Sequence, residues 1–207
     1  MIKNIIFDFD GVILDSMEIK TEAFKELFHD YPNDYIEKLL EYHKKNGGIS
    51  RYEKIKYFFI EILKEKEIDK SKINFYANQY SQITKNILSN PKLLINDTIK
   101  FIENNYHKYN FHIASGADEK DLKYICKKLK LEKYFLSIHG SPTNKKTIIE
   151  IIIKNNNYNK NETILIGDSI NDLLAAKENH IEFFGYNNPH FQKQNIKYIE
   201  SFKWQKI

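Results

Sequence analysis

Two aspartates near the start of the chain lie where an apolar run ends. Residues 5–7 are apolar, Asp8 and Asp10 follow them, and Gly11 comes next. Residues two apart in a β-strand point to the same side, so a strand here would bring both carboxylates to its end together. Because burying two like charges without a counter-charge is costly, the pair indicates a bound cation, and carboxylate oxygens suit Mg²⁺. The simpler alternative is a polar turn, since Asp-Gly is a common turn dipeptide.

A second acidic cluster follows a second apolar run. Residues 164–166 are apolar, Asp168 comes shortly after them, and Asp172 lies one helical turn further on. If the two runs form neighbouring strands, Asp8, Asp10 and Asp168 converge and can bind one Mg²⁺. Asp168 could instead cap the following helix, a common role for aspartate. Asp172 could hold the metal ligands in place through hydrogen bonds.

Two smaller signals lie between these clusters. Ser115 and Gly116 end a third apolar run, residues 111–114, and a helix after them would direct free N–H groups at an anion. Ser-Gly is also ordinary turn chemistry, so this signal is weak alone. Lys145 or Lys146 could balance carboxylate and phosphate charge, although a solvated side chain is the simpler interpretation of either lysine in a lysine-rich chain.

The elements that must position these residues are predicted to be alternating strands and helices. Three segments are expected to be strands with polar groups at their carboxyl ends: residues 2–9, 111–114 and 163–166. Each is followed by small or acidic residues and then by a helical pattern, which predicts an α/β fold with a doubly wound, parallel, Rossmann-like sheet. Residues 134–139 and 181–186 are candidates for further strands. Ligands of such sheets bind beyond the carboxyl ends of the strands.

The segment 15–90 has a different pattern. It is helical by periodicity, with apolar residues at helical spacing and without a convincing strand. Ser50 and Glu53 have the spacing of a capping box at the start of one of its helices, and Pro91 marks its end. We therefore expect a helical cap domain at 15–90, inserted into a core made of residues 1–14 and 91–207.

The bulk properties narrow the class of protein. The net charge is +4, but lysines and acidic residues alternate without a basic block, so we expect no nucleic-acid partner. Cys126 is the single cysteine, which excludes an internal disulfide, fits a cytoplasmic location and indicates a buried structural thiol. No apolar run is long enough to span a membrane, the N-terminus lacks a signal-peptide pattern, and the histidines lack zinc-ligand spacing.

The order of these signals resembles the haloacid dehalogenase superfamily, and the resemblance covers the core almost end to end. The matching motifs are Asp8-Phe9-Asp10-Gly11-Val12 with Asp15-Ser16, then Ser115, then Lys145 or Lys146, then Gly167-Asp168-Ser169-Ile170-Asn171-Asp172. The first and last are specific, whereas the middle two depend on position. Lys145 is preferred to Lys146 for its placement relative to Ile148 and Ile149. The helical insert is similar to the cap of the phosphoglycolate phosphatase and β-phosphoglucomutase branch.

This resemblance implies a role for each residue. Asp8 would attack phosphorus and form an aspartyl-phosphate, with the charge screened by Mg²⁺ and Lys145. Asp10 would protonate the leaving oxygen and then activate water, and its main-chain carbonyl would also bind the metal. Ser115 and the Gly116 N–H would hold phosphoryl oxygens. Dehalogenase members lack the second acid, so Asp10 favours phosphoryl transfer over cleavage of a carbon–halogen bond.

The resemblance favours a phosphatase acting on a small phosphorylated metabolite such as a sugar phosphate, with a sugar-phosphate mutase as the alternative. The loop 48–51 resembles a mutase loop whose arginine grips a second phosphate, although Ser50 and Arg51 could merely begin a helix. Lys20 stands where a mutase normally has histidine. Arg51 and Lys20 could still favour a substrate with another anionic group.

A non-catalytic binding protein is the remaining alternative, and the intact pair of Asp8 and Asp10 disfavours it. We expect a monomer or weak dimer and a cap that opens and closes over the site.

Overall fold

Six parallel strands form the sheet at the centre of the computed structural model, which describes residues 1–204. Their order across the sheet is β3-β2-β1-β4-β5-β6, so β1 lies between β2 and β4 and the strand order reverses beside it. The strands are β1 (Asn4–Phe7), β2 (Asn110–Asp118), β3 (Ser137–Ser141), β4 (Thr163–Gly167), β5 (Glu182–Tyr186) and β6 (Tyr198–Ile199). The predicted α/β class with a doubly wound parallel sheet is confirmed.

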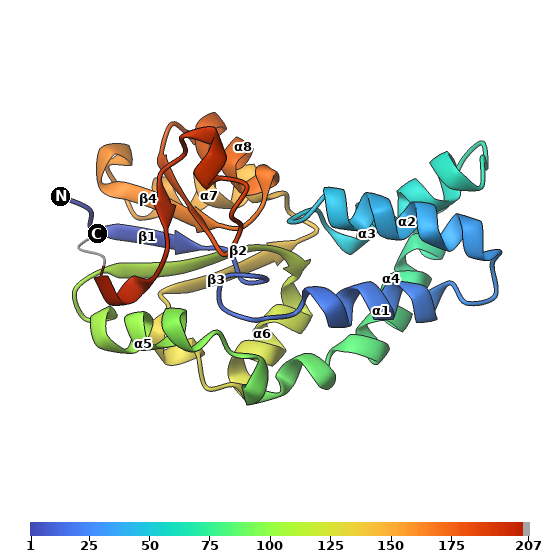
Figure 1. Cartoon of the computed structure of the whole chain (residues 1–207), viewed down its shortest axis with the longest axis horizontal. Coiled ribbons are helices and arrows are strands. Elements are labelled where there is room, and N and C mark those ends of the chain that lie inside the picture. Colours follow the sequence, from blue (N-terminus) through green and yellow to red (C-terminus); the bar gives the residue numbers. More distant parts are fainter. Residues whose placement is uncertain (205–207) are drawn as a thin grey trace.

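Helices cover both faces of this sheet. In β1, Ile5 and Phe7 join one buried apolar cluster while Ile6 joins the other, as the alternation of side chains along a strand requires. Figure 1 shows helices against both faces. One pair is α5 (Asn96–Asn105) and α6 (Glu119–Lys128), and the other is α7 (Lys145–Asn155) and α8 (Ile170–Asn179).

The segment between β1 and α5 is helical and has a core of its own. Its helices, here called the cap helices, are α1 (Met17–Leu27), α2 (Asn33–Lys45), α3 (Arg51–Tyr57) with a π-helical continuation at Phe58–Ile62, and α4 (Lys70–Thr84). They lie together to one side of the sheet in Figure 1. Aromatic residues dominate their separate core, among them Phe24, Phe28, Phe58 and Phe59. We propose that they form the predicted cap, with its boundaries near residues 14 and 91.

The two chain segments that connect the cap helices to the sheet lie side by side. The Asp15 N–H donates to the Leu93 carbonyl at 2.8 Å, and the Ile95 N–H donates to the Ile13 carbonyl at 3.0 Å. A pair of adjacent connections is the arrangement that lets one group of helices rotate against the rest of a molecule.

The strand bounds differ from the predicted ones in four main places. β3 covers Ser137–Ser141 rather than residues 134–139. β1 is shorter than residues 2–9, and β2 runs on to Asp118 through an irregular stretch after Ala114. β6 is missing from the prediction because two residues are too few to display an alternating pattern. Single-turn 3₁₀ helices occupy Ile87–Ser89, Pro91–Leu93, Glu132–Tyr134, Lys160–Glu162, Gln192–Gln194 and Phe202–Trp204. Among the described residues, every helix is too short or too polar to cross a bilayer.

The two helix starts for which the sequence suggests a side-chain cap both have one. Ser50 accepts a hydrogen bond from the Glu53 N–H at 3.3 Å, as predicted for α3. At α8 the cap is Ser169 rather than Asp168, and Ser169 and Asp172 form a reciprocal capping box. Because Ser169 caps the helix, the Asp168 carboxylate is available for another role.

Candidate active site

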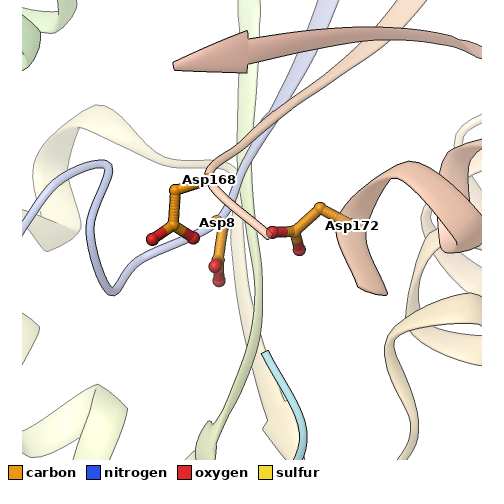
Figure 2. A group of neighbouring side chains, drawn as sticks. All are labelled: Asp8, Asp168 and Asp172. Carbon is orange, nitrogen blue, oxygen red and sulfur yellow. The ribbon is translucent and has the colours of Figure 1, made fainter. Parts of the chain in front are cut away.

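Three carboxylates meet where β1 and β4 end. Asp8 follows β1, Asp168 follows β4, and Asp172 lies in the first turn of α8. One oxygen from each lies within 4.8 Å of the others. Figure 2 shows Asp172 reaching from the helix toward Asp8, with Asp168 on the other side of Asp8. The adjacency of β1 and β4 therefore brings together acids that are 160 residues apart in the chain.

Lys145 is the cation of this cluster. It is the first residue of α7 and its side chain is almost fully buried. Its Nζ lies 2.8 Å from Asp8 Oδ1 and also pairs with Asp172 Oδ1. Lys146 points elsewhere, is exposed, and lies 3.5 Å from Glu178. The structure thus brings the preferred lysine, and not its neighbour, to the carboxylates.

Asp172 holds this arrangement in place. Its Oδ1 pairs with Lys145, and its Oδ2 accepts hydrogen bonds from the Ser169 N–H at 3.0 Å and the Ser169 hydroxyl at 2.6 Å. Gly167 makes this close approach possible, since a Cβ there would lie 2.4 Å from the Asp172 Cβ. With both oxygens engaged, Asp172 orients Lys145 toward Asp8, which is the supporting role expected from the sequence.

The charges of the cluster do not balance. Burial, followed by the charge of Asp172, raises the pKa of Asp8 although Lys145 opposes this change. Burial and then Asp8 likewise raise the pKa of Asp168. Burial disfavours the charge on Lys145, but Asp172 and Asp8 together hold its pKa above the usual range. One lysine cannot compensate three carboxylates, so the cluster has room for a further positive charge.

The donor chemistry of the cluster fits Mg²⁺. Magnesium takes carboxylate oxygens and water, commonly with one or two carboxylates from the protein. Asp168 has no hydrogen-bond donor or cation beside its carboxylate among residues 1–204, and it lies against Asp8. Gly11, at φ +76°, leaves the space for it, since a Cβ there would lie 2.1 Å from Asp168 Oδ2. Asp8 and Asp168 are therefore the side chains that would hold the ion.

Asp10 lies outside this group of three. Its Oδ1 accepts a hydrogen bond from the Ser16 hydroxyl at 2.6 Å, and its Oδ2 pairs with Lys20 of α1. Burial raises the pKa of Asp10, but Lys20 and then Ser16 outweigh that effect and hold it below the usual range. The predicted substrate residue Lys20 is thus placed at the boundary between the cap helices and the sheet, against the predicted acid.

Ser115 and Gly116 lie on β2, beside β1, but the helix after them starts later than predicted. Ser115 is fully buried and its hydroxyl accepts a hydrogen bond from the Ala117 N–H at 3.1 Å. The next helix, α6, begins at Glu119, and Asp118 caps it by accepting from the N–H groups of residues 120 and 121. Those groups already have an acceptor, so the helix start cannot serve as the predicted anion site. Gly116 itself still lines the cavity of the site.

Arg51 is held by protein groups through one of its guanidinium nitrogens. Its Nη1 donates to Asp121 at 2.8 Å, to the Ser81 hydroxyl at 2.5 Å and to the Ala77 carbonyl at 3.3 Å. Its guanidinium also lies 4.9 Å from the centre of the Tyr80 ring. Since Asp121 belongs to α6, this pair connects the cap helices to the sheet layer.

The loop before α3 closes against the strand ends. Asn171 donates to the Gly47 carbonyl at 2.6 Å, and the Gly48 carbonyl lies so close to Gly116 that a Cβ there would be 2.1 Å away. The cavity between this loop and the strand ends holds about 40 Å³. Its lining comes from both layers: Asp10, Met17, Lys20, Phe24, His43, Gly47, Gly48, Ile49, Arg51, Lys54, Tyr80, Gly116 and Ala117.

Two residues of this lining were missed in the sequence. His43 is one of seven scattered histidines and Lys54 one of many lysines, so neither residue type nor spacing distinguishes them. Both are buried in the structure, and the Lys54 Nζ lies 2.9 Å from His43 Nδ1. The packing of α2 against α3 creates this pair. Cys126, by contrast, is a buried free thiol as predicted.

Comparison with known proteins decides the family. The model of the haloacid dehalogenase-like hydrolase family matches residues 5–186. The chain belongs to this family. A phosphorylated carbohydrates phosphatase from Thermotoga maritima is 22% identical over 183 residues, which cover 86% of this chain and 82% of that protein. The predicted superfamily and the predicted phosphatase class of enzyme are confirmed.

Solved structures share the fold of this haloacid dehalogenase-like hydrolase. A β-phosphoglucomutase from Clostridium difficile superposes with a TM-score of 0.78 at 18% identity, over 100% of this chain and 94% of that chain. The hydrolase YfnB from Bacillus subtilis, bound to magnesium, superposes with a TM-score of 0.70 at 18% identity, over 98% of this chain and 96% of that chain. Both similarities extend over the cap helices as well as the sheet.

Proposed function

We propose that this hydrolase is a Mg²⁺-dependent phosphatase that cleaves a small phosphorylated carbohydrate through an aspartyl-phosphate on Asp8. The observation that supports this most is the position of Asp8, between Lys145 and the unpaired carboxylate of Asp168, below a closed cap. The Thermotoga relative, named for phosphorylated carbohydrates, supports the substrate class, and the magnesium bound to YfnB supports the metal.

In the first step, Asp8 attacks the phosphorus of the ester. Lys145 and the Phe9 N–H, at 2.8 and 2.7 Å, hold Asp8 Oδ1, so the other carboxylate oxygen is the one with freedom to react. A bond forms between this oxygen and phosphorus, and the bond to the ester oxygen breaks. The leaving oxygen takes a proton from Asp10, which must first separate from Lys20 and bind that proton, because the pairing holds the pKa of Asp10 below its usual range. When bound, Mg²⁺ supplies positive charge that lowers the repulsion between the carboxylate and the phosphoryl group.

In the second step, water attacks the phosphorus of the aspartyl-phosphate. Asp10, now a carboxylate, takes a proton from the water, and the bond between Asp8 and phosphorus breaks to release inorganic phosphate. The N–H of Gly116 would hold a phosphoryl oxygen, as would the Ser115 hydroxyl after a local rearrangement. The closed loop at Gly47 and Gly48 excludes bulk water while the charge is transferred.

The test is phosphate release from p-nitrophenyl phosphate and from a panel of sugar phosphates, with Mg²⁺ and with EDTA. We expect turnover with Mg²⁺ and its loss with EDTA. A protein that binds these esters and releases no phosphate would be the non-catalytic alternative instead.

A sugar-phosphate mutase is the second candidate, supported by the fold similarity to β-phosphoglucomutase. Its mechanism would need a second phosphate held by the cap, and Arg51 is already paired with Asp121. Supplying β-glucose 1-phosphate separates the two candidates. Glucose 6-phosphate without net release of phosphate would establish the mutase, whereas we expect inorganic phosphate.

A further inference from the structure

We propose that Lys54 and His43 form a subsite for an anionic group on the part of the substrate that leaves as the alcohol, an inference that rests on the phosphatase function proposed above. The basic side chains that line the closed cavity are Lys20, Arg51, Lys54 and His43. Lys20 is paired with Asp10, and Arg51 with Asp121. Lys54, in contrast, has no carboxylate within ion-pair distance among residues 1–204.

The surroundings of Lys54 are unfavourable for a positive charge. Its side chain is buried at 4% exposure, and its one hydrogen-bond partner within the described chain is His43 Nδ1 at 2.9 Å. Burial, together with the nearby charge of Lys20, lowers the pKa of Lys54 to about 7. A buried cation without an anion is costly, so an anionic ligand beside it would be stabilised strongly.

His43 supplies a second, independent sign of a missing ligand. Its Nε2 is buried and has no hydrogen-bond partner within the described residues. A charged lysine can only donate, so Nδ1 accepts from Lys54 and the proton resides on Nε2. Burial, followed by the charge of Lys54, lowers the pKa of His43 to about 3, so it stays neutral. Lys54 therefore supplies an ammonium group to the cavity lining, and His43, which also lines the cavity, has a buried N–H donor at Nε2 without a partner among the described residues.

The same cavity is lined by Lys54 and His43 and by residues proposed to take part in the reaction. Asp10, the proposed acid, and Gly116, a proposed phosphoryl ligand, line the same space. A volume of about 40 Å³ is room for roughly three waters, or for one compact anionic group. A substrate with its phosphoryl group at Asp8 would thus place a second anion at Lys54. A carboxylate and a second phosphoryl group share this chemistry.

The test compares matched esters that differ in that group. The first pair is 3-phosphoglycerate and glycerol 3-phosphate, which tests a carboxylate; the second is fructose 1,6-bisphosphate and fructose 6-phosphate, which tests a second phosphoryl group. We expect kcat/KM to favour the more anionic member of at least one pair by about tenfold to a hundredfold, the size of a hydrogen bond to a buried charge. The favoured pair identifies the anion.

The variants Lys54→Met and His43→Leu test whether the preference for the more anionic ester comes from the proposed subsite. Lys54→Met should bring the ratio within the favoured pair close to one, and His43→Leu should lower it less. Lys56→Met is the matched control, because Lys56 is exposed on the same helix; its ratio should equal that of the unaltered protein. Thermal melts verify that each variant is folded.

Two results would overturn the inference. One is a ratio near one for both pairs in the unaltered protein, and the other is a ratio that Lys54→Met leaves unchanged. Calorimetric dissociation constants for the same esters, measured on Asp8→Asn, give the same comparison without turnover. If no ester and no p-nitrophenyl phosphate is hydrolysed, the proposed function fails, while those constants still decide whether Lys54 recognises the second anion.

Discussion

The strand ends and the cap helices, here called the sheet side and the cap side of the site, have opposite charge imbalances. On the sheet side, Asp8, Asp168 and Asp172 face a single cation, Lys145. The surplus is negative, and together with burial, which is the larger cause, it raises the pKa of Asp8 and of Asp168.

On the cap side the surplus is positive. Lys20 and Arg51 each have a carboxylate, whereas Lys54 has only the neutral His43. The sheet side thus lacks a cation and the cap side lacks an anion, and a metal-bound substrate with two anionic ends would correct both. The comparison teaches that the proposed metal site and the proposed anion subsite lie in different layers of the molecule.

The largest effect is expected on the sheet side, from removal of the proposed nucleophile. Asp8→Asn keeps the size of the side chain but abolishes the charge that attacks phosphorus, so we expect turnover of p-nitrophenyl phosphate to fall on the order of a thousandfold or more. Asp34→Asn, an exposed aspartate on α2, is the matched control and should be unaffected. Turnover by Asp8→Asn within tenfold of the unaltered protein would exclude the aspartyl-phosphate.

The next effect concerns the metal. At about a hundred times its dissociation constant, Mg²⁺ should stabilise the fold by about 2.7 kcal/mol, which is a rise in Tm of roughly 5–10 °C. Asp168→Asn should lose this rise and about a hundredfold in turnover, since it removes an unpaired carboxylate. Differential scanning calorimetry with and without Mg²⁺ measures it. If Mg²⁺ raises the Tm of Asp168→Asn as much as that of the unaltered protein, the ion binds at another site.

The cap side predicts an effect of opposite sign on stability. Replacing buried Lys54 with methionine removes an uncompensated charge, so we expect Lys54→Met to be more stable by about 1–4 kcal/mol at pH 6. The pKa of Lys54 lies at about 7 in the folded state and at 10.5 in the unfolded state. Between these values the unfolded chain binds more protons, so the unaltered protein gains stability as pH rises and the difference shrinks.

The groups that set this pH dependence are those around Lys54: His43 from α2, Lys20 from α1, and Asp10 after β1. Urea unfolding at pH 6 and pH 9 measures it, with Lys56→Met as the control. A Lys54→Met protein that is less stable at pH 6 would show that Lys54 contributes to folding rather than to recognition.

The sequence predicts the sheet side of the site better than the cap side, and the reason is geometric. Asp8 and Asp168 each end an apolar strand, and the carboxyl ends of adjacent parallel strands meet at one edge of the sheet. Local pattern therefore determines where these side chains go. The same reasoning cannot place Lys54 or His43, since their approach depends on how α2 and α3 pack.

The hydrogen-bond and ion-pair partners of the predicted residues cannot be identified from the sequence, for a related reason. From the sequence, Arg51 could equally be a phosphate ligand or part of a helix start. Only the position of α6 in the structure shows that Asp121 lies beside it. Likewise, the extension of β2 to Asp118 moves the start of α6 away from Ser115. Long-range ion pairs and irregular strand ends leave no periodic signal in the chain.

The smallest predicted effect concerns the contact between the two sides. The Tyr52 hydroxyl on α3 donates to Asp118 Oδ2 at 2.6 Å, across the boundary between cap helices and sheet. Tyr52→Phe removes this bond and keeps the ring, so the closed arrangement should lose about 1 kcal/mol, which is about a fivefold shift toward opening. Hydrogen exchange of a peptide covering residues 46–50 should then be up to about fivefold faster.

Tyr57→Phe is the matched control for this measurement. Tyr57 lies on the same helix and stacks on Tyr42 at 3.6 Å between ring centres, and its hydroxyl has no hydrogen-bond partner in the described part of the chain. Its exchange should equal that of the unaltered protein. If Tyr52→Phe also leaves exchange unchanged, the closure depends on Arg51 with Asp121 and on the Asn171 bond to Gly47 instead. The cap would then be held closed by the contacts nearest the cavity, and opening would require breaking an ion pair buried on both sides.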